Sequence, residues 1–516
     1  TNPTQLVSFG TSGHRGTSVD GTFTDLHVAA ITQAICDGRK QFGATGPIFV
    51  GQDTHALSQP ALVTVLEVLA GNGVTAMVDC DMAFVPTPSV SRAIIRYNEE
   101  HDDKADGIII TPSHNPPDNG GIKYNTIIGG PADTVVTKWI EMRANEYLTA
   151  YCESEDFKRI SIDNIEPTAQ VPYDYKGLYV EELGDVINME AIKAAGPKVL
   201  VDTLGGSGAS YWNAIKERYG LDLTIIHDDY DPTFSFMTYD HDGKVRMDCS
   251  STYVMASVIN RIGDFDLAVG NDPDYDRYGI VVSSGLISAN TFLTLAARYL
   301  FTTRGWKNKG VGKTVVCTTM IDKWAADAET PVFEVPVGFK YFSQLLFDGA
   351  IGIGGEESAG ASFLKKDGTV WTTDKDGMIM ALLSMEIMAV MGKSALKMAD
   401  EFVEEFGNPS FGRIDAPCKK EQKQILKQMS AELITATTVD GDPITNIRTT
   451  SLYNDMPIDG VRVETDKGWF VARPSGTEDL YKIYGESYKG DLGLVALLTA
   501  GEEIVNAALN GTIETE

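Results

Sequence analysis

The chain has 516 residues, too many for a single hydrophobic core, so we expect three or four domains with clefts between them. Its formal net charge of −29 argues against binding nucleic acid, and it would repel a phosphorylated ligand unless a local cluster of Lys and Arg surrounds that ligand. We find no apolar run of bilayer length and no N-terminal signal segment, which predicts a cytoplasmic protein without membrane contact. The six cysteines show no CxxC spacing, which argues against zinc and against a disulfide scaffold.

The first 110 residues alternate between strand-like and helix-like patterns. A glycine- and hydroxyl-rich segment, SFGTSGHRGTS (8–18), carries Arg15, is similar to an anion-binding loop, and precedes a helical pattern that begins near Leu26. The alternation then runs through PIFVGQD, QPALVTVLEVLAGNGV, TAMVDC, a helix from about Pro88 to Tyr97, and ADGIIIT. This order predicts a parallel sheet with helices on both faces.

The next stretch, GIIITPSHNPPDNGGIKYN (107–125), changes from an apolar strand-like run into a loop that holds Ser113. Three prolines stiffen this loop, and two glycines let its backbone approach a ligand closely. His114 adds a hydrogen-bonding group and Lys123 adds a cation. We interpret Ser113 as a phosphate carrier, with an ordinary surface turn as the alternative.

Two further units of similar layout follow. The second contains KVLVDTLGGSG, ASYWNAIKERYG, LDLTIIHD and FDLAVGNDPDYDRYGIVVSS, and the third contains KTVVCTTM, PVFEVPVGF and AIGIGGEESAG. We interpret GGSG (205–208) as a strand-to-helix turn, because no Lys follows it as in a Walker loop. After about residue 415 the pattern changes to that of a smaller α+β domain.

Within the second unit, NDPDYDR places Asp272, Asp274 and Asp276 at alternate positions of a tight loop. Three carboxylates on one side of a loop suit Mg²⁺, and an EF-hand is excluded because its sixth and twelfth positions would be Arg277 and Ser283. Arg277 would face a phosphate. A solvated acidic turn is the alternative.

The third unit offers polar groups for a sugar. GIGGEESAGASF (352–363) places Glu356, Glu357 and Ser358 on a glycine-flanked loop, although an ordinary helix N-terminus would also favour acidic residues. The segments VPVGFKYF and TDKDG add Gly338, Lys340 and Lys375, and either lysine could be a solvated surface charge.

The last segment with candidate ligand groups is ARPSGTEDLYK (472–482), whose donors suit a phosphate dianion. A helix capping box formed by Ser475 and Glu478 is the alternative, but the alternation of LYKIYGES favours a strand. The phosphate donors are Arg473, Ser475, the amide of Gly476, and Thr477.

Taken in order, these motifs resemble those of the α-D-phosphohexomutase superfamily over nearly the whole chain: GTSGHRG, TPSHNPP, DPDYDR, GEES and RPSGTE. The longer strings ITPSHNPP, GGIKYN, VPVGFK, GGEESAGASF and TTDKDG are similar to its bacterial branch of glucose-phosphate-specific phosphoglucomutases. Glu357 supports glucose, because the mannose and glucosamine branches have another residue there.

The resemblance implies an α/β fold of four domains around a central cleft. Three similar α/β domains with mixed sheets would span residues 1–190, 191–305 and 306–415. A C-terminal α+β domain with a topology like that of the TATA-binding protein would span residues 416–516. Each domain would contribute one loop to the cleft.

The resemblance also implies interconversion of glucose 1-phosphate and glucose 6-phosphate through a phosphoserine and glucose 1,6-bisphosphate, with one Mg²⁺ per chain, in a monomer or homodimer. A phosphatase and a non-catalytic sugar-phosphate binder are the alternatives, whereas a triad hydrolase is excluded because no GxSxG segment is present. The implied roles are phosphoryl carrier (Ser113), support (His114), metal ligands (a phosphoserine oxygen, Asp272, Asp274, Asp276), transition-state cations (Arg15, Arg277), proton transfer (Lys123, Lys375), sugar contacts (Gly338, Lys340, Glu356, Ser358) and distal phosphate contacts (Arg473, Ser475, Gly476, Thr477).

Overall fold

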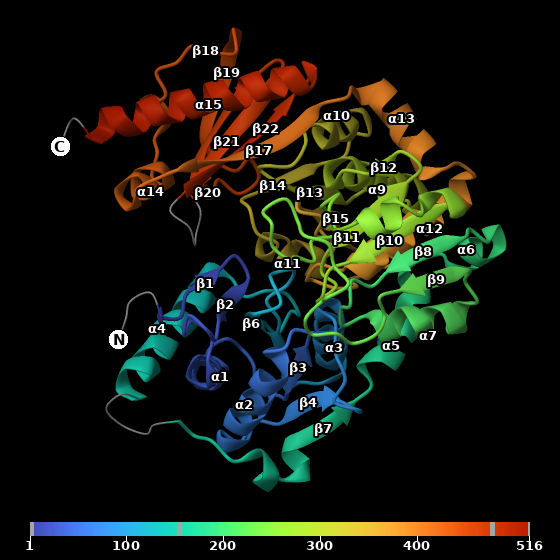
Figure 1. The fold of residues 1–516 in the computed structure, drawn as a ribbon, viewed down its shortest axis with the longest axis vertical. Coiled ribbons are helices and arrows are strands. Elements are labelled where there is room, and N and C mark those ends of the chain that lie inside the picture. Colours follow the sequence, from blue (N-terminus) through green and yellow to red (C-terminus); the bar gives the residue numbers. More distant parts are fainter. Residues whose placement is uncertain (1–4, 152–156, 475–479, 514–516) are drawn as a thin grey trace. The chain divides into compact units, whose positions relative to one another are not determined.

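The structure is a computed structural model that describes residues 5–151, 157–474 and 480–513. These residues form two compact units, and each unit is assembled from separate stretches of the chain. The first unit comprises residues 1–306 and 339–396, and the second comprises residues 307–338 and 397–516. Figure 1 labels the elements of both units along the chain.

The first unit begins with a seven-stranded mixed sheet in the order β1-β2-β6-β5-β3-β4-β7. Strands β5, β3, β4 and β7 are parallel to one another, as the sequence predicted. Strands β6, β2 and β1 are each antiparallel to the preceding neighbour, so β6 pairs antiparallel with β5, β2 with β6, and β1 with β2. The loop of residues 111–118 is too short for a crossover helix, so β6 must return antiparallel to β5. The strands are β1 (Phe9–Gly10), β2 (Gly13–Thr17), β3 (Ile48–Gln52), β4 (Ala76–Asp79), β5 (Asp106–Ile110), β6 (Asn119–Asn125) and β7 (Gln170–Tyr173).

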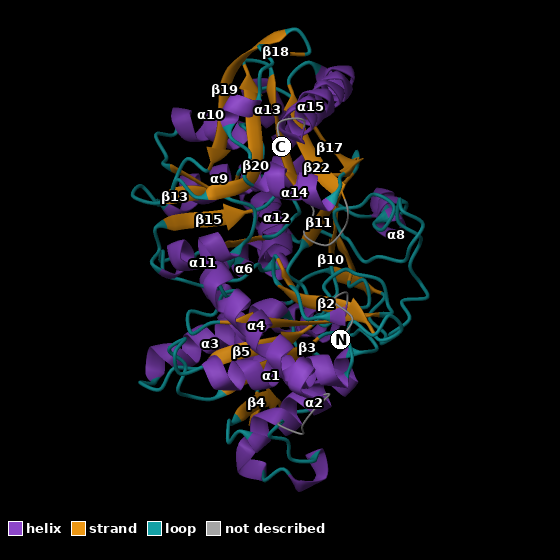
Figure 2. Ribbon diagram, turned by 90° about the vertical axis from the view of Figure 1, so that its left-hand side faces the viewer, coloured by secondary structure: helices purple, strands orange, loops and turns teal. Residues whose placement is uncertain are grey.

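Both faces of this sheet are covered by helices. Successive side chains of β5 point to opposite faces of the sheet. Ile108 and Ile110 pack against α1, α2 and α4 on one face, and Ile109 packs against α3 on the other. Figure 2 shows these helices in purple beside the orange strands. This two-sided burial fixes where β5 ends, and hence where Ser113 lies. The helices are α1 (Asp25–Gly38), α2 (Ser58–Gly71), α3 (Thr87–Glu100), α4 (Thr134–Tyr151) and α5 (Tyr175–Val186).

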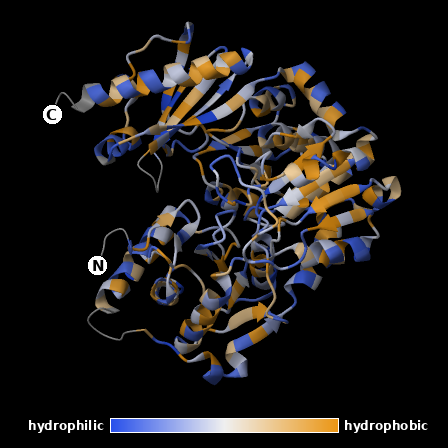
Figure 3. Ribbon diagram, in the orientation of Figure 1, coloured by the Kyte–Doolittle hydropathy of each residue, from blue (hydrophilic) through white to orange (hydrophobic). Residues whose placement is uncertain are grey.

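The second sheet of the first unit has the order β12-β11-β10-β8-β9. Strands β10, β8 and β9 are parallel, and β11 returns antiparallel to β10 through the loop that carries the three aspartates. Figure 3 shows hydrophobic residues in orange along these strands. The elements are β8 (Val199–Asp202), β9 (Leu223–Ile226), β10 (Leu267–Asn271), β11 (Tyr278–Val282), β12 (Gly285–Leu286), α6 (Met189–Ala195), α7 (Ala209–Tyr219), α8 (Ala256–Ile259) and α9 (Ala289–Arg304).

The remaining part of the first unit contains an antiparallel hairpin. Its turn carries Glu356, Glu357 and Ser358, so these residues do not begin a helix. Gly205 at φ +65° lies in the turn between β8 and α7, which confirms the prediction for GGSG. The hairpin and its helices are α11 (Lys340–Phe347), β15 (Ile351–Gly355), β16 (Ala361–Phe363) and α12 (Gly377–Met391).

The second unit contains a parallel strand pair, β13 and β14, and an antiparallel sheet in the order β17-β22-β21-β20-β19-β18. Helices α14 and α15 contact strands of this sheet. The elements are β13 (Gly310–Thr314), α10 (Met320–Asp327), β14 (Val332–Val335), α13 (Ala395–Phe406), β17 (Ser410–Pro417), α14 (Lys420–Lys427), β18 (Thr438–Val439), β19 (Asp442–Thr450), β20 (Pro457–Thr465), β21 (Gly468–Pro474), β22 (Leu480–Ser487) and α15 (Gly490–Ile513).

Helix α15 is long and apolar enough over residues 490–510 to cross a membrane by length and composition alone, a stretch that the sequence analysis did not identify. Leu497, Leu498, Val505 and Leu509 nevertheless lie in the hydrophobic core with the antiparallel sheet. The helix therefore has the partly buried face of a core helix in a folded domain.

Candidate active site

Ser113 lies in the β5–β6 loop with its side chain buried and its backbone at φ +61°. Its amide donates to Thr111 Oγ1 at 2.8 Å, and its hydroxyl donates to Asp272 Oδ2 at 3.2 Å. A positive φ is uncommon for serine and requires support from the surroundings. The loop therefore holds this hydroxyl in a fixed direction, toward the predicted metal ligands.

The support comes from a buried group that the sequence analysis missed. Asp53 accepts hydrogen bonds from Thr111 Oγ1 at 2.6 Å, Ser58 Oγ at 2.6 Å and His55 Nδ1 at 2.8 Å. His55 Nε2 lies 2.9 Å from the carbonyl oxygen of Asn115, so both ring nitrogens donate. Burial opposes the charge on His55, but Asp53 raises its pKa. The signal was the polar string QDTHALS directly after a buried strand.

Asp272, Asp274 and Asp276 converge as the sequence predicted. One oxygen from each carboxylate lies within 4.8 Å of the others, and all three side chains are buried. Asp274 Oδ1 and Asp276 Oδ1 accept no hydrogen bond from the described residues. Burial and the two neighbouring carboxylates raise the pKa of Asp272. Three buried carboxylates, two of which have an oxygen without a hydrogen bond, fit a hard divalent cation such as Mg²⁺.

Two lysines contact the same carboxylates. Lys123 Nζ lies 2.6 Å from Asp274 Oδ2 and 3.2 Å from Asp276 Oδ2. Lys375 Nζ lies 3.0 Å from Asp276 Oδ2. Burial opposes the negative charge of Asp276, but Lys375 and Lys123 lower its pKa. Both lysines are therefore buried in the aspartate cluster, and Lys375 is not the solvated surface charge that the sequence left open.

Arg15 and Arg277 add two cations to this part of the molecule. Burial and the charge of Arg277 lower the pKa of Arg15. Arg277 lies 3.8 Å from Asp276 Oδ1 and, through Nη1, 3.8 Å from Asp248 Oδ2. Guanidinium groups favour a bound anion.

His114 is held beside the serine. Its Nδ1 lies 3.3 Å from Ser113 Oγ, and its Nε2 lies 3.9 Å from Asp248 Oδ2. Burial and the charge of Arg277 lower the pKa of His114 well below its usual value. Asp248 was not identified from the sequence, because its loop carries no recognisable motif. The structure therefore adds a carboxylate that faces both His114 and Arg277.

The hairpin turn between β15 and β16 brings its acidic residues to the same cluster. The carbonyl of Ala359 accepts from the amide of Tyr278 at 3.1 Å, which joins this turn to the aspartate loop. Burial raises the pKa of Glu356 to about 7, while Lys375 lowers it. A cavity of about 20 Å³ is lined by Thr11, Ser12, Lys123, Pro131, Asp276, Phe339, Lys340, Glu356, Asp374 and Lys375.

The remaining predicted residues are not part of this cluster as described. Ser358 lies half-buried in the hairpin turn. Gly338, at φ +134°, and Arg473 belong to the second unit, where Arg473 Nε donates to the carbonyl of Ile458 at 3.0 Å. Ser475, Gly476 and Thr477 lie outside the described residues.

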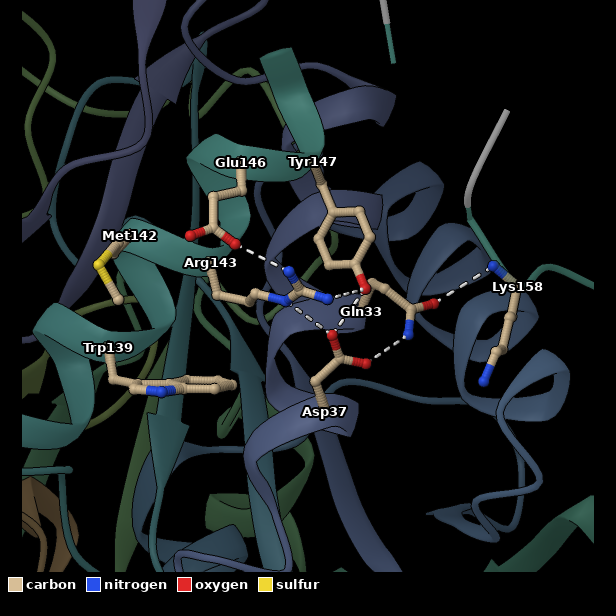
Figure 4. A pocket seen from close by; sticks show the side chains of 8 residues that line it. All are labelled: Gln33, Asp37, Trp139, Met142, Arg143, Glu146, Tyr147 and Lys158. Carbon is tan, nitrogen blue, oxygen red and sulfur yellow. Dashed lines mark hydrogen bonds and ion pairs between the residues drawn. The ribbon is translucent and has the colours of Figure 1, made fainter. Parts of the chain in front are cut away.

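A larger cavity of about 600 Å³ lies between α1 and α4, away from these groups (Figure 4). The polar side chains of this cavity form hydrogen bonds with one another, since the Asp37 carboxylate accepts hydrogen bonds from Gln33, Arg143 and Tyr147. No predicted site residue in the described parts of the chain lines it. The small cavity, by contrast, is lined by several predicted site residues, namely Lys123, Asp276, Lys340, Glu356 and Lys375.

Comparison with protein families gives matches along most of the chain. Residues 6–150, 178–285 and 288–406 match the phosphoglucomutase/phosphomannomutase alpha/beta/alpha domains I, II and III, and residues 415–492 match the C-terminal domain of the same family. The predicted fold class of three α/β domains with mixed sheets followed by a C-terminal α+β domain is confirmed.

Individual relatives agree with these matches. The chain is 47% identical to a phosphoglucomutase of Komagataeibacter xylinus, over 98% of this chain and 91% of that protein. It is 27% identical to phosphoglucomutase 1 of Saccharomyces cerevisiae, over 91% and 85% of the two chains. The fold is similar to that of a putative phosphomannomutase from Thermus thermophilus, with a TM-score of 0.76, 23% identity, and coverage of 97% and 99%.

Proposed function

Because the chain belongs to the phosphoglucomutase/phosphomannomutase family and is therefore an isomerase of the phosphotransferase type, we propose that it interconverts glucose 1-phosphate and glucose 6-phosphate. One observation carries the proposal: the fixed Ser113 hydroxyl lies 3.2 Å from a buried triple-aspartate cluster. Phosphoryl transfer depends mainly on positioning and charge neutralisation, and this arrangement supplies both. The similar phosphoglucomutase and Glu357 support glucose as the sugar.

In this proposal Ser113 carries the phosphoryl group. Asp272, Asp274 and Asp276, with an oxygen of the phosphoserine, would hold Mg²⁺, which would neutralise charge on the transferring group when bound. Arg15 and Arg277 stabilise the same group through their positive charges. His114 borders the serine and keeps its loop in place.

The remaining residues act on the sugar and on the phosphate that is not reacting. Lys123 and Lys375 transfer protons to and from the sugar hydroxyls. Glucose 1,6-bisphosphate forms, turns over and returns its other phosphoryl group to Ser113. We assign Gly338, Lys340, Glu356 and Ser358 to the sugar, and Arg473, Ser475, Gly476 and Thr477 to the distal phosphate.

The first test is a coupled assay on glucose 1-phosphate with Mg²⁺, in which released inorganic phosphate is measured in parallel. Formation of glucose 6-phosphate without stoichiometric inorganic phosphate supports a mutase. Release of phosphate as the main product would instead indicate a phosphatase, and no turnover of either kind would indicate a binding protein.

A second test concerns the phosphoserine itself. Ser113→Ala should lose activity and should lack the phosphate adduct seen in the intact mass of the parent enzyme. Ser113→Gly, which tolerates the positive φ, guards against a folding defect, and Ser235→Ala on an exposed loop is the control that keeps the adduct. An active or equally phosphorylated Ser113→Gly enzyme would contradict the assignment.

A further inference from the structure

The Lys123 ammonium occupies an unusual place for a proton-transfer group. Its Nζ contacts Asp274 and Asp276, which are two of the three carboxylates that fit a metal ion. All three side chains are buried, so water screens their charges weakly. The lysine comes from β6, whereas the two aspartates come from the β10–β11 loop, so tertiary folding brings them together.

Lys123 shares its acceptor atoms with the predicted metal site. Asp274 Oδ2 accepts from both Lys123 Nζ and Thr87 Oγ1, at 2.6 and 2.7 Å. A Mg²⁺ ion requires carboxylate oxygens at roughly 2.0 to 2.1 Å, and two cations on the same buried carboxylates repel each other strongly. Asp274 Oδ1 and Asp276 Oδ1 accept no hydrogen bond from the described residues, so the ammonium satisfies these carboxylates only in part.

Lys123 also has somewhere to move. Its side chain lines the cavity of about 20 Å³ that Glu356, Lys340 and Lys375 border. These are the residues assigned above to the sugar and to proton transfer. Asp276 and Asp374 line the same cavity, so a rotation of the lysine away from Asp274 would keep its ammonium beside carboxylates and bring it toward the residues assigned to the sugar.

We propose that Lys123 is an internal counter-cation that competes with the divalent metal ion for Asp274 and Asp276, and that metal binding displaces its ammonium toward the sugar pocket. The inference rests on the metal site of the proposed function. Metal loading would then do two things: it would complete the phosphoryl-transfer site and release a proton-transfer group. Among the described ion pairs with the three aspartates, Lys375 reaches Asp276 alone, so it would compete more weakly.

The test is direct metal binding to the dephosphorylated enzyme, with Mn²⁺ as the probe and free Mn²⁺ measured by electron paramagnetic resonance. Lys123→Met removes the charge but keeps a side chain of similar length, so its Kd for Mn²⁺ should fall at least ten-fold. Lys375→Met should give a smaller decrease. Lys158→Met, at an exposed position outside the cluster, is the control and should bind Mn²⁺ like the parent enzyme.

A second readout separates competition from a structural role. The Mg²⁺ concentration that half-activates Lys123→Met should fall while its kcat also falls, because the variant binds metal more tightly but lacks the proton-transfer group. Thermal unfolding confirms that the variant is folded, and Lys123→Gln replaces it if it is not. Unchanged or weaker Mn²⁺ binding by the folded variant would overturn the inference.

Asp274→Asn distinguishes this failure from failure of the metal site. If the parent binds Mn²⁺ and Asp274→Asn binds it more weakly, while Lys123→Met binds like the parent, only the counter-cation inference is wrong. If the parent binds no Mn²⁺, or Asp274→Asn binds it equally well, both the metal site and the inference are overturned.

Discussion

At the scale of single residues, the position of Ser113, the proposed phosphoryl carrier, depends on Asp53, which does not contact it. Asp53 holds Thr111, and Thr111 Oγ1 accepts the amide hydrogen of Ser113. The carboxylate is fully buried, and its charge is balanced by His55. Buried ion pairs of this kind are costly to break, because removing one charge leaves the other unpaired in a region of low dielectric constant.

Asp53→Asn should therefore affect both stability and catalysis. We expect a loss of about 3 to 5 kcal/mol in the free energy of unfolding, as is typical when a buried charged pair is broken. We also expect at least a ten-fold decrease in kcat, because the Ser113 loop loses its anchor. Urea unfolding and the mutase assay, both well below the unfolding temperature, measure the two effects.

Asp229→Asn is the matched control for this change. Asp229 is exposed on a loop, so its replacement should cost less than about 1 kcal/mol in the free energy of unfolding and leave kcat unchanged. If folded Asp53→Asn turns over like the parent, Asp53 supports the fold without positioning the serine loop.

Sequence reasoning could find residues whose chemistry is visible in a short string, and it missed those that depend on tertiary contact. Asp272, Asp274 and Asp276 are alternate residues of one loop, so their convergence follows from local geometry. Asp248, by contrast, meets His114 only after two separate loops fold together. Residues assigned only by resemblance, such as Arg473, remain predictions.

At the scale of elements, strand patterns were predicted better than strand limits. The string KTVVCTTM was assigned to the third α/β unit without strand limits, and β13 spans Gly310–Thr314, so it includes only the first two residues of the string. Val315 and Val316 instead lie in a buried cluster with Ile458 and Trp469, so their apolar character reflects packing outside the ladder. An apolar run records burial, and burial does not by itself distinguish a strand from a packed loop.

A buried aspartate at the start of α12 predicts how the stability of the protein changes with pH. The Asp376 carboxylate caps this helix by accepting a hydrogen bond from the amide of Ile379, and it also accepts hydrogen bonds from the side chains of Tyr179 and Trp371. Burial raises the pKa of Asp376 to about 6, above the usual 3.8. Between about pH 4 and pH 6 the folded protein therefore keeps a proton that the unfolded chain releases, so the free energy of unfolding falls as pH rises through this window, by about 3 kcal/mol.

Asp376→Asn tests this assignment, because an amide does not titrate. The variant should be less stable at every pH, because its NH₂ group cannot accept the hydrogen bond that Tyr179 or Trp371 donates to the carboxylate. Its free energy of unfolding should nevertheless fall less steeply between pH 4 and pH 6. Urea unfolding at several pH values gives both slopes. Parallel curves for the parent and the variant would show that another group is responsible for the decrease.

At the scale of the whole molecule, the strong negative charge acts against the proposed substrate. A net charge of −29 repels a hexose phosphate dianion at long range, whereas Arg15, Arg277 and the lysines attract it only near the site. Salt weakens the long-range repulsion more than the short-range attraction, because exposed charges are screened beyond about 10 Å at 0.1 M ionic strength and buried ones are screened much less. Association should therefore become faster as salt is added from a very low concentration.

We accordingly expect kcat/KM for glucose 1-phosphate to rise several-fold between about 10 and 100 mM KCl, at a fixed free Mg²⁺ concentration, with kcat nearly unchanged.

Glu100→Lys combined with Asp102→Lys is the matched variant. Both positions are exposed, and the two changes add four charges, which brings −29 to −25. This variant should show a higher kcat/KM at low salt and a smaller rise with KCl. A decrease of kcat/KM with salt in the parent enzyme would mean that the cations of the site govern the approach of the substrate, and that the net charge of the chain does not.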